Sequence, residues 1–259
     1  MDSRYHHATG LVLKHSTLGE SDRRVIFLIP GLGKIAAKAR GAKKLTSPFT
    51  SRLSPLNICQ LLLYKTPANS WTVTQCQTQE RFPELQTNLL KSSLALSMMD
   101  IVHRCTEEGH VSDPTSDSLY HLTTQTLQTM NTLKDEVKAH LLFQTYQIQT
   151  LDILGVLPSF STCAKCHKKI DLETLEGWHP LELLCTTCSQ AANHLAYDLF
   201  DNSYLKLLNF MRKSSIQEML NIKLTPIQSK TMTQILLMLW KAQAFSIPKS
   251  IDALESLHA

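Results

Sequence analysis

The sequence lacks an apolar run long enough to cross a membrane. Its longest apolar stretches, such as residues 25–29, are far shorter than the roughly 20 residues that a spanning helix requires. Residues 1–4 lead into polar positions and not into the apolar core of a signal peptide. We therefore expect a soluble cytoplasmic protein without a membrane partner.

Motifs of common catalytic sites are also missing. The Gly-Leu-Gly-Lys turn at residues 31–34 lacks the four-residue gap and the Gly-Lys-Ser/Thr of a phosphate-binding loop. No His-x-Glu occurs, although zinc-dependent nucleobase deaminases require one. Repeats and low-complexity segments are absent as well, and 43% of the residues are hydrophobic. We expect a globular protein that is not an enzyme.

Charge is scarce overall but unevenly distributed. The net charge of the chain is only +4, which by itself identifies no partner. Residues 1–83 contain 12 Lys and Arg against 4 Asp and Glu, whereas the rest contains 14 against 18. The first third is therefore a cation attached to a slightly anionic remainder, which favours a polyanionic partner at the N-terminal end.

The basic N-terminal third has the pattern of a small β-barrel. Short runs with β-type composition are separated by turns that contain Gly, Pro, Ser or Asn. The runs are residues 9–14, 24–29, 35–40, 56–64 and 71–76. Five short strands in this length predict a five-stranded OB-fold, although an SH3-like barrel would have a similar pattern.

After residue 83 the apolar period changes from two to about 3.6, which predicts helices. One stripe comprises Leu90, Leu94, Met98, Ile101 and Cys105, and another comprises Val137, Leu141, Ile148 and Leu151. A third helix is expected at about residues 119–133. We predict an α+β protein with an OB-fold domain at residues 1–82 and a helical domain at 83–259, interrupted at about 159–190.

Two further signals delimit the predicted helices. Gly155 is placed to end the second helix, and Pro158 prevents its continuation. Near the C-terminus, Thr225-Pro226-Ile227-Gln228 has the composition of an N-cap, a first-turn proline and a capping-box partner. These residues predict a helix that includes the apolar run at residues 235–240.

The interruption contains two Cys-x-x-Cys pairs, Cys163 with Cys166 and Cys185 with Cys188, separated by eighteen residues. Such pairs can place four thiolates around one ion, the arrangement of a structural zinc site. Four sulfurs leave no position for an activated water, so we expect zinc to stabilise a loop too short for its own core. A redox pair and an iron–sulfur cluster are the alternatives.

Other cysteines and histidines have simpler interpretations. Cys59, Cys76 and Cys105 stand alone in the sequence, and we expect small buried side chains. His167, His179 and His194 lie near the cysteine pairs and could compete as ligands, but each is expected to be a solvated loop residue.

Cations alternate with small apolar residues in the third predicted strand. Lys34, Lys38 and Arg40 share one face, while Ile35, Ala37 and Ala39 share the other. A row of cations on a strand matches a phosphate backbone. The candidate DNA-binding residues are Arg23, Arg24, Lys34, Lys38, Arg40, Lys43, Lys44 and Arg52. Tyr5, Phe49 and Trp71 could stack on bases or belong to the core.

Two groups of motifs resemble the RecO family of DNA-repair proteins. Residues 10–23 and 31–44, from Gly-Leu-Val-Leu to Gly-Glu-Ser-Asp-Arg and from Gly-Leu-Gly-Lys to Ala-Arg-Gly-Ala-Lys-Lys, are similar to the N-terminal part of that family. Leu-Gly-Val-Leu-Pro at residues 154–158, followed by the first cysteine pair, resembles its helix end and first zinc knuckle. The resemblance extends to Cys188, and the C-terminal stretch agrees only in type and length.

The resemblance implies an N-terminal OB-fold, a helical domain and a zinc loop in a bacterial, nucleoid-associated protein. It implies that the protein binds single- and double-stranded DNA and anneals complementary strands. It also implies that RecR and the single-stranded-DNA-binding protein are partners and that RecA is an indirect one. Lys34, Lys38, Arg40, Lys43 and Lys44 would lie in the DNA-contacting strand and loop. Arg23 falls in a turn where it could be structural, and His167 stands where many members have glycine.

Charge neutralisation is the mechanism that these residues suggest. Two strands that repel each other would come together on one cationic surface, and base pairing would then drive annealing. An RNA-binding OB-fold protein and a protein–protein adaptor remain the alternatives. The family also implies a groove for an acidic peptide tail on the helical domain, which the sequence does not locate.

Overall fold

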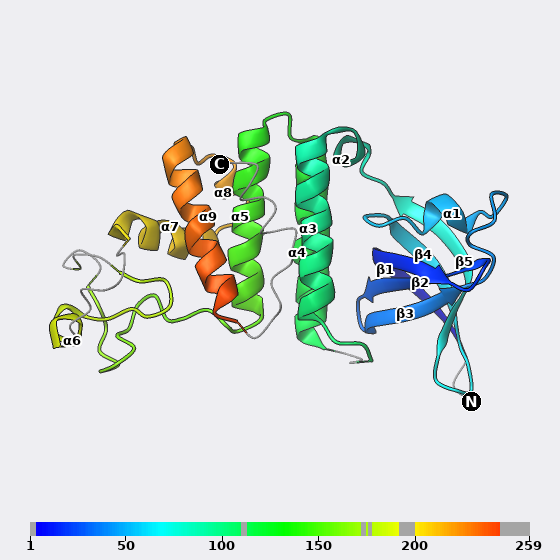
Figure 1. Cartoon of the computed structure of the whole chain (residues 1–259), viewed down its shortest axis with the longest axis horizontal. Coiled ribbons are helices and arrows are strands. Elements are labelled where there is room, and N and C mark those ends of the chain that lie inside the picture. The colour runs from blue at the N-terminus through cyan, green and yellow to red at the C-terminus, as the bar shows by residue number, and fades with distance from the viewer. Residues whose placement is uncertain (1–3, 110–112, 172–174, 176–177, 192–199, 244–259) are drawn as a thin grey trace. The chain divides into compact units, whose positions relative to one another are not determined.

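The computed structural model describes residues 4–109, 113–171, 175, 178–191 and 200–243 (Figure 1). Within these residues the chain forms two compact units. The first unit extends to Ala139 and contains all five strands, and the second begins at His140 and is helical. None of the described helices is both long and apolar enough to span a bilayer.

The first unit is built on a closed five-stranded barrel in the order β1-β2-β3-β5-β4. Neighbouring strands are antiparallel except for β3 and β5, which pair in parallel over two residues. The strands are β1 Tyr5–Leu18, β2 Asp22–Ile29, β3 Gly33–Ala39, β4 Ile58–Lys65 and β5 Trp71–Glu80. This topology confirms the predicted OB-fold.

Side chains that alternate along the strands fill the interior of the barrel. Phe27, Leu63 and Ala39 are completely buried there, and Cys59 and Cys76 lie in the same core. The expectation of small buried cysteines is thus confirmed for these two, whereas Cys105 is half-buried. Ile35, Ala37 and Ala39 of the third strand face this core, as the alternation predicts.

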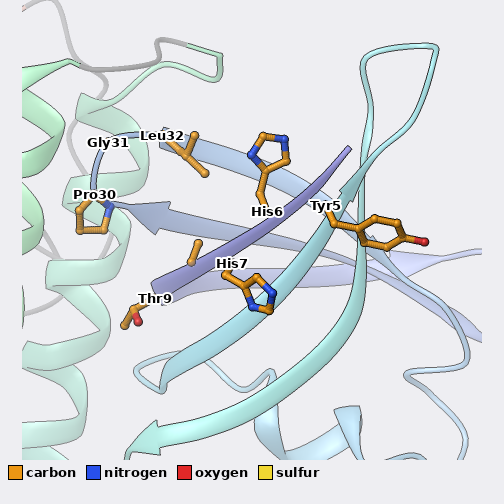
Figure 2. Close-up of a pocket in the computed structure, with 8 residues that line it drawn as sticks. Tyr5, His6, His7, Thr9, Pro30, Gly31 and Leu32 are labelled. Carbon is orange, nitrogen blue, oxygen red and sulfur yellow. The ribbon is translucent and has the colours of Figure 1, made fainter. Parts of the chain in front are cut away.

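The first half of β1 has a strand neighbour on one side. It pairs with β4 from Tyr5 to Leu11 and with β2 from Leu11 onward. β2 ends at Ile29, and the chain turns away through Gly31, whose φ is +75°. Between this turn and β1 lies a hollow of about 600 Å³ (Figure 2).

Helices complete the first unit. They are α1 Phe49–Arg52, α2 Pro83–Thr87, α3 Leu89–Cys105 and α4 Pro114–Thr132. In α3, Leu94, Met98 and Ile101 of the predicted stripe are completely buried. The carboxylate of Asp113 caps α4 by accepting from the N–H groups of Thr115 and Ser116, so this helix begins five residues earlier than predicted.

Helix α5, Glu136–Ile153, begins in the first unit and continues through the second. The other described helices of the second unit are α6 Thr186–Ala191, α7 Asn202–Lys213, α8 Ile216–Met219 and α9 Pro226–Lys241. Leu141, Ile148 and Leu151 of the predicted stripe are buried, but Val137 is 63% exposed. The prediction was wrong for Val137 because it lies in the first turn, before the buried part of α5 begins at Ala139.

Both predicted helix boundaries in the second unit are confirmed. Gly155 has a φ of +68°, and the N–H of Val156 donates to the carbonyl of Leu151, which closes the C-terminus of α5. At α9, the hydroxyl of Thr225 accepts from the N–H of Gln228, whose side chain accepts in return from the Thr225 N–H.

Candidate zinc module and nucleic-acid surface

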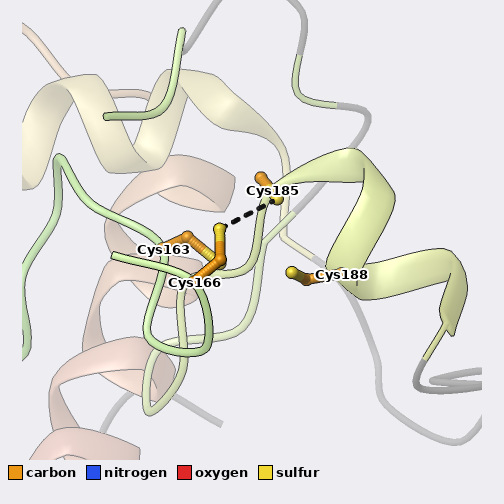
Figure 3. Close-up of side chains that lie close together, drawn as sticks. All are labelled: Cys163, Cys166, Cys185 and Cys188. Atoms are coloured by element: carbon orange, nitrogen blue, oxygen red, sulfur yellow. Dashed lines mark hydrogen bonds between the residues drawn. The ribbon is translucent and has the colours of Figure 1, made fainter. Parts of the chain in front are cut away.

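The four predicted metal ligands lie together in the second unit. The Sγ atoms of Cys163, Cys166, Cys185 and Cys188 are all within 4.8 Å of one another, and those of Cys166 and Cys185 are 3.8 Å apart (Figure 3). Tetrahedral zinc with Zn–S bonds of about 2.3 Å would separate its sulfurs by about 3.8 Å. The cluster therefore has the ligand type and size that a structural zinc ion requires.

Backbone hydrogen bonds shape the first cysteine turn. The Cys163 N–H donates to the carbonyl of Lys168, and the His167 N–H donates to the carbonyl of Cys163. The Ala164 N–H donates to the carbonyl of Leu183 and so ties the first half of the module to the second. These bonds fix the two cysteine pairs next to each other, and the module also buries Phe160, Trp178 and Leu183.

The turn also favours thiolate at Cys163. Burial would raise the pKa of this thiol, but backbone N–H groups of Cys166, Cys185 and Lys165 donate to its sulfur and lower the pKa to about 6. In the same cluster, side-chain hydrogen bonds with the other cysteines raise the pKa of Cys188 to about 12, so the unmetallated cluster favours thiolate at Cys163 and thiol at Cys188.

The two described histidines near the cluster, His167 and His179, do not join it. His167 is exposed and has a φ of +59°, a left-handed conformation that favours glycine. His167 therefore occupies a backbone position that glycine would adopt with less strain. Among the described residues, neither His167 nor His179 belongs to the group of metal-ligating atoms. His194 lies outside the described residues.

Three of the eight candidate DNA-binding residues are exposed at or beyond the end of β3. Arg40, Lys43 and Lys44 follow one another around the turn at Gly41. Within the part of the chain that the structure describes, no ion pair occupies them. Their charges are therefore directed to solvent, where phosphates could reach them.

Two other candidates, the exposed Arg24 and the half-buried Lys38, hold carboxylates. The guanidinium of Arg24 donates to both carboxylate oxygens of Glu108 at 2.8 and 3.1 Å, and the Lys38 ammonium lies 2.9 Å from the carboxylate of Asp22. The N–H of Gly41 and the ammonium of Lys38 donate to Asp22 and lower its pKa to about 2. A phosphate would compete with these carboxylates for the same cations.

Arg23 and Arg52 are half-buried and stabilise the connection between β3 and β4. Arg23 donates to the carbonyl of Thr50 at 3.1 Å, and Arg52 donates to the carbonyl of Cys76 at 2.8 Å. Each guanidinium therefore fastens α1 and its flanking residues to the barrel, which agrees with the structural alternative for Arg23.

Lys34 lies inside the first unit, with only 6% of its surface exposed. Its ammonium donates to the carbonyl of His103 at 2.7 Å and also to that of Thr106, at the C-terminal end of α3. Burial lowers the pKa of this lysine, while Glu108 and Glu107 oppose the shift. The alternation of β3 gave the correct outward face, but it could not reveal that a helix end covers this position. Its contacts give Lys34 a structural role.

The aromatic candidates differ in exposure. Tyr5 is 53% exposed, whereas Phe49 and Trp71 are partly buried against the barrel core. Sequence reasoning missed two neighbours of Trp71. The His6 ring meets it edge-on at 5.0 Å, and the Lys65 ammonium lies 5.2 Å from its ring centroid. The pairing of β1 with β4 and of β4 with β5 brings these residues together, and no local sequence signal indicates it.

The chain is an OB-fold protein with a candidate zinc module. It combines a basic five-stranded barrel with a helical unit and a four-thiol cluster of zinc-site dimensions. Two family models match the chain, that of the recombination protein O N-terminal domain over residues 1–82 and that of its C-terminal domain over residues 86–250. The chain therefore belongs to the RecO family.

Individual relatives agree with this assignment. A DNA repair protein RecO from Alkaliphilus metalliredigens is 23% identical over 88% of this chain and 89% of its own length. Those of Halalkalibacterium halodurans and Heliobacterium modesticaldum are 25% and 30% identical. They cover 90% and 68% of this chain and 87% and 60% of their own lengths.

Proposed function

We propose that this protein acts in DNA repair as a recombination mediator without catalytic activity. It binds single- and double-stranded DNA through the barrel at residues 1–82, anneals complementary strands, and assists the loading of RecA onto protein-coated single strands. Its protein partners are RecR and the single-stranded-DNA-binding protein, and residues 83–259 form its helical part. Family membership supports the repair role, and the exposed cations beside β3 support the DNA-binding surface.

The surface combines the exposed cations with two that are already paired. Arg40, Lys43 and Lys44 attract the phosphate backbone, and Lys38 and Arg24 join when DNA displaces their carboxylates. Neutralising phosphates releases condensed counterions, which drives binding and lowers the repulsion between two strands. Base pairing then supplies the free energy of annealing, so the protein breaks and forms no covalent bond.

Zinc fits the four thiolates of the module as a structural ion. Cys163, Cys166, Cys185 and Cys188 would hold it, and it would add four bonds to a module that also buries Phe160 and Trp178. With the coordination sphere filled by sulfur, the residues around it keep the loop folded and take no part in DNA chemistry.

Charge reversal tests the surface. In a titration of a fluorescent oligonucleotide, we expect Lys38→Glu/Arg40→Glu/Lys43→Glu to bind at least tenfold more weakly than wild type in dilute salt, because it removes three cations and adds three anions. The control Lys206→Glu/Lys213→Glu/Lys230→Glu makes the same change at exposed positions of the second unit. Equal affinities of the first variant and wild type would reject the surface, and a stronger preference for RNA competitors would reject DNA as the substrate.

A further inference from the structure

The hollow beside the first half of β1 has no role in the function described so far. Its lining comes from two segments of the first unit, Tyr5–Thr9 of β1 and Pro30–Leu32 of the following turn. Figure 2 shows His6 and Leu32 on one side of β1, with His7 and Thr9 on the other. The hollow is open to solvent because β2 ends before it could cover this part of β1.

The chemistry of the lining suits a flat ring with polar edges. Tyr5, His6 and His7 contribute rings, and Pro30 and Leu32 contribute apolar surface. His6 lies on the same side of β1 as Leu32, whereas His7 lies on the other side. A base on the Leu32 side can stack on the His6 imidazole, which can also donate or accept hydrogen bonds at the edge of the base. At about 600 Å³ the hollow has ample room for one such ring.

Cations border the same place. The His6 ring touches Trp71, and the ammonium of Lys65 lies over the Trp71 ring. Trp71 is opposite Ala37 in the ladder between β3 and β5, next to Lys38 of the proposed DNA surface. A strand whose base enters the hollow can therefore keep its phosphates near Lys65 and Lys38.

We propose that this hollow is a binding site for an unstacked nucleobase of single-stranded nucleic acid. The proposal rests on the function proposed above and adds that the protein distinguishes single strands from duplexes. Phosphates are common to single strands and duplexes, but only a single strand offers a base that is free to leave its stack. The barrel cations bind both forms, whereas the hollow favours the single strand.

The test compares single-stranded and duplex oligonucleotides of equal length with the full-length protein. Stacking contributes enough that removing one ring weakens binding by about tenfold. We expect His6→Ala to weaken single-strand binding by about that factor and to leave duplex binding unchanged. His15→Ala is the control, because His15 is a partly buried histidine of β1 outside the hollow. Thermal melting checks that each variant is folded.

An abasic oligonucleotide separates this proposal from the general one. Wild type should bind an abasic strand more weakly than the normal strand and should show less quenching of Trp71 fluorescence. Trp71 dominates such quenching because Trp178 and Trp240 are only 2% and 1% exposed. Equal binding of normal and abasic strands, or equal losses for single strand and duplex, would overturn the base site and leave the DNA surface intact. Failure to bind either strand would overturn the proposed function itself.

Discussion

At the scale of single residues, Lys34 differs from the other cations at β3 in its burial. Lys38 and Arg40 on the same face of β3 reach solvent, but the Lys34 ammonium holds two carbonyls where α3 ends. Cations stabilise helix C-termini, and hydrogen bonds from a charged donor are the strong ones. The residue therefore connects the barrel to a helix within the first unit.

Replacing this lysine should affect stability more than binding. We expect Lys34→Met to lower the free energy of unfolding by about 2 kcal/mol, because two helix-terminal carbonyls lose a charged donor. Lys38→Met, which breaks an exposed ion pair, should cost about 1 kcal/mol at most. Urea denaturation measures both. A fully stable Lys34→Met that binds DNA tenfold more weakly would return Lys34 to the DNA surface.

Glu108 restrains a neighbouring cation. Because its carboxylate occupies the Arg24 guanidinium, phosphate must displace it before Arg24 can contribute. We expect Glu108→Gln to strengthen DNA binding about threefold, the scale of an exposed ion pair. Glu20→Gln removes the same charge from the exposed turn after β1 and serves as the control. An equal gain from both variants, or a gain that persists beside Arg24→Gln, would contradict this pairing.

At the scale of elements, the first cysteine turn contains a correctable strain. His167 adopts a left-handed conformation that costs a non-glycine residue about 1 kcal/mol. We expect His167→Gly to bind zinc about fivefold more tightly in competition with a chromophoric chelator. His179, which is not among the described residues with positive φ, provides the contrasting variant His179→Gly, which should not gain affinity. Unchanged or weaker zinc binding by His167→Gly would show that the turn is not strained.

Some elements of the fold could be predicted from the sequence, and some of their contacts could not. The strands and the caps of α5 and α9 followed from local signals, namely alternation, turn glycines and the Thr225–Gln228 pair. The burial of Lys34 and the pairing of Arg24 with Glu108 depend on residues about 70 and 84 positions away. The prediction that Val137 is buried failed for a related reason. Periodicity cannot show at which turn a helix begins to pack against its neighbours.

At the scale of the whole molecule, the account depends on charge asymmetry. The cysteine spacing alone located the four-cysteine cluster, and the charge count alone located the basic barrel. Neither could show which cations are available, because three of the eight candidates hold backbone carbonyls and two hold carboxylates. Only the folded chain separates Arg40, Lys43 and Lys44 from the structural cations.

The salt dependence of DNA binding tests this account most directly. The logarithm of the association constant of wild type should fall linearly with the logarithm of salt concentration, with a slope that counts the neutralised phosphates. The Lys38→Glu/Arg40→Glu/Lys43→Glu variant should show a slope shallower by about 3. Identical slopes, or wild-type binding that does not respond to salt, would contradict a cationic surface on the barrel.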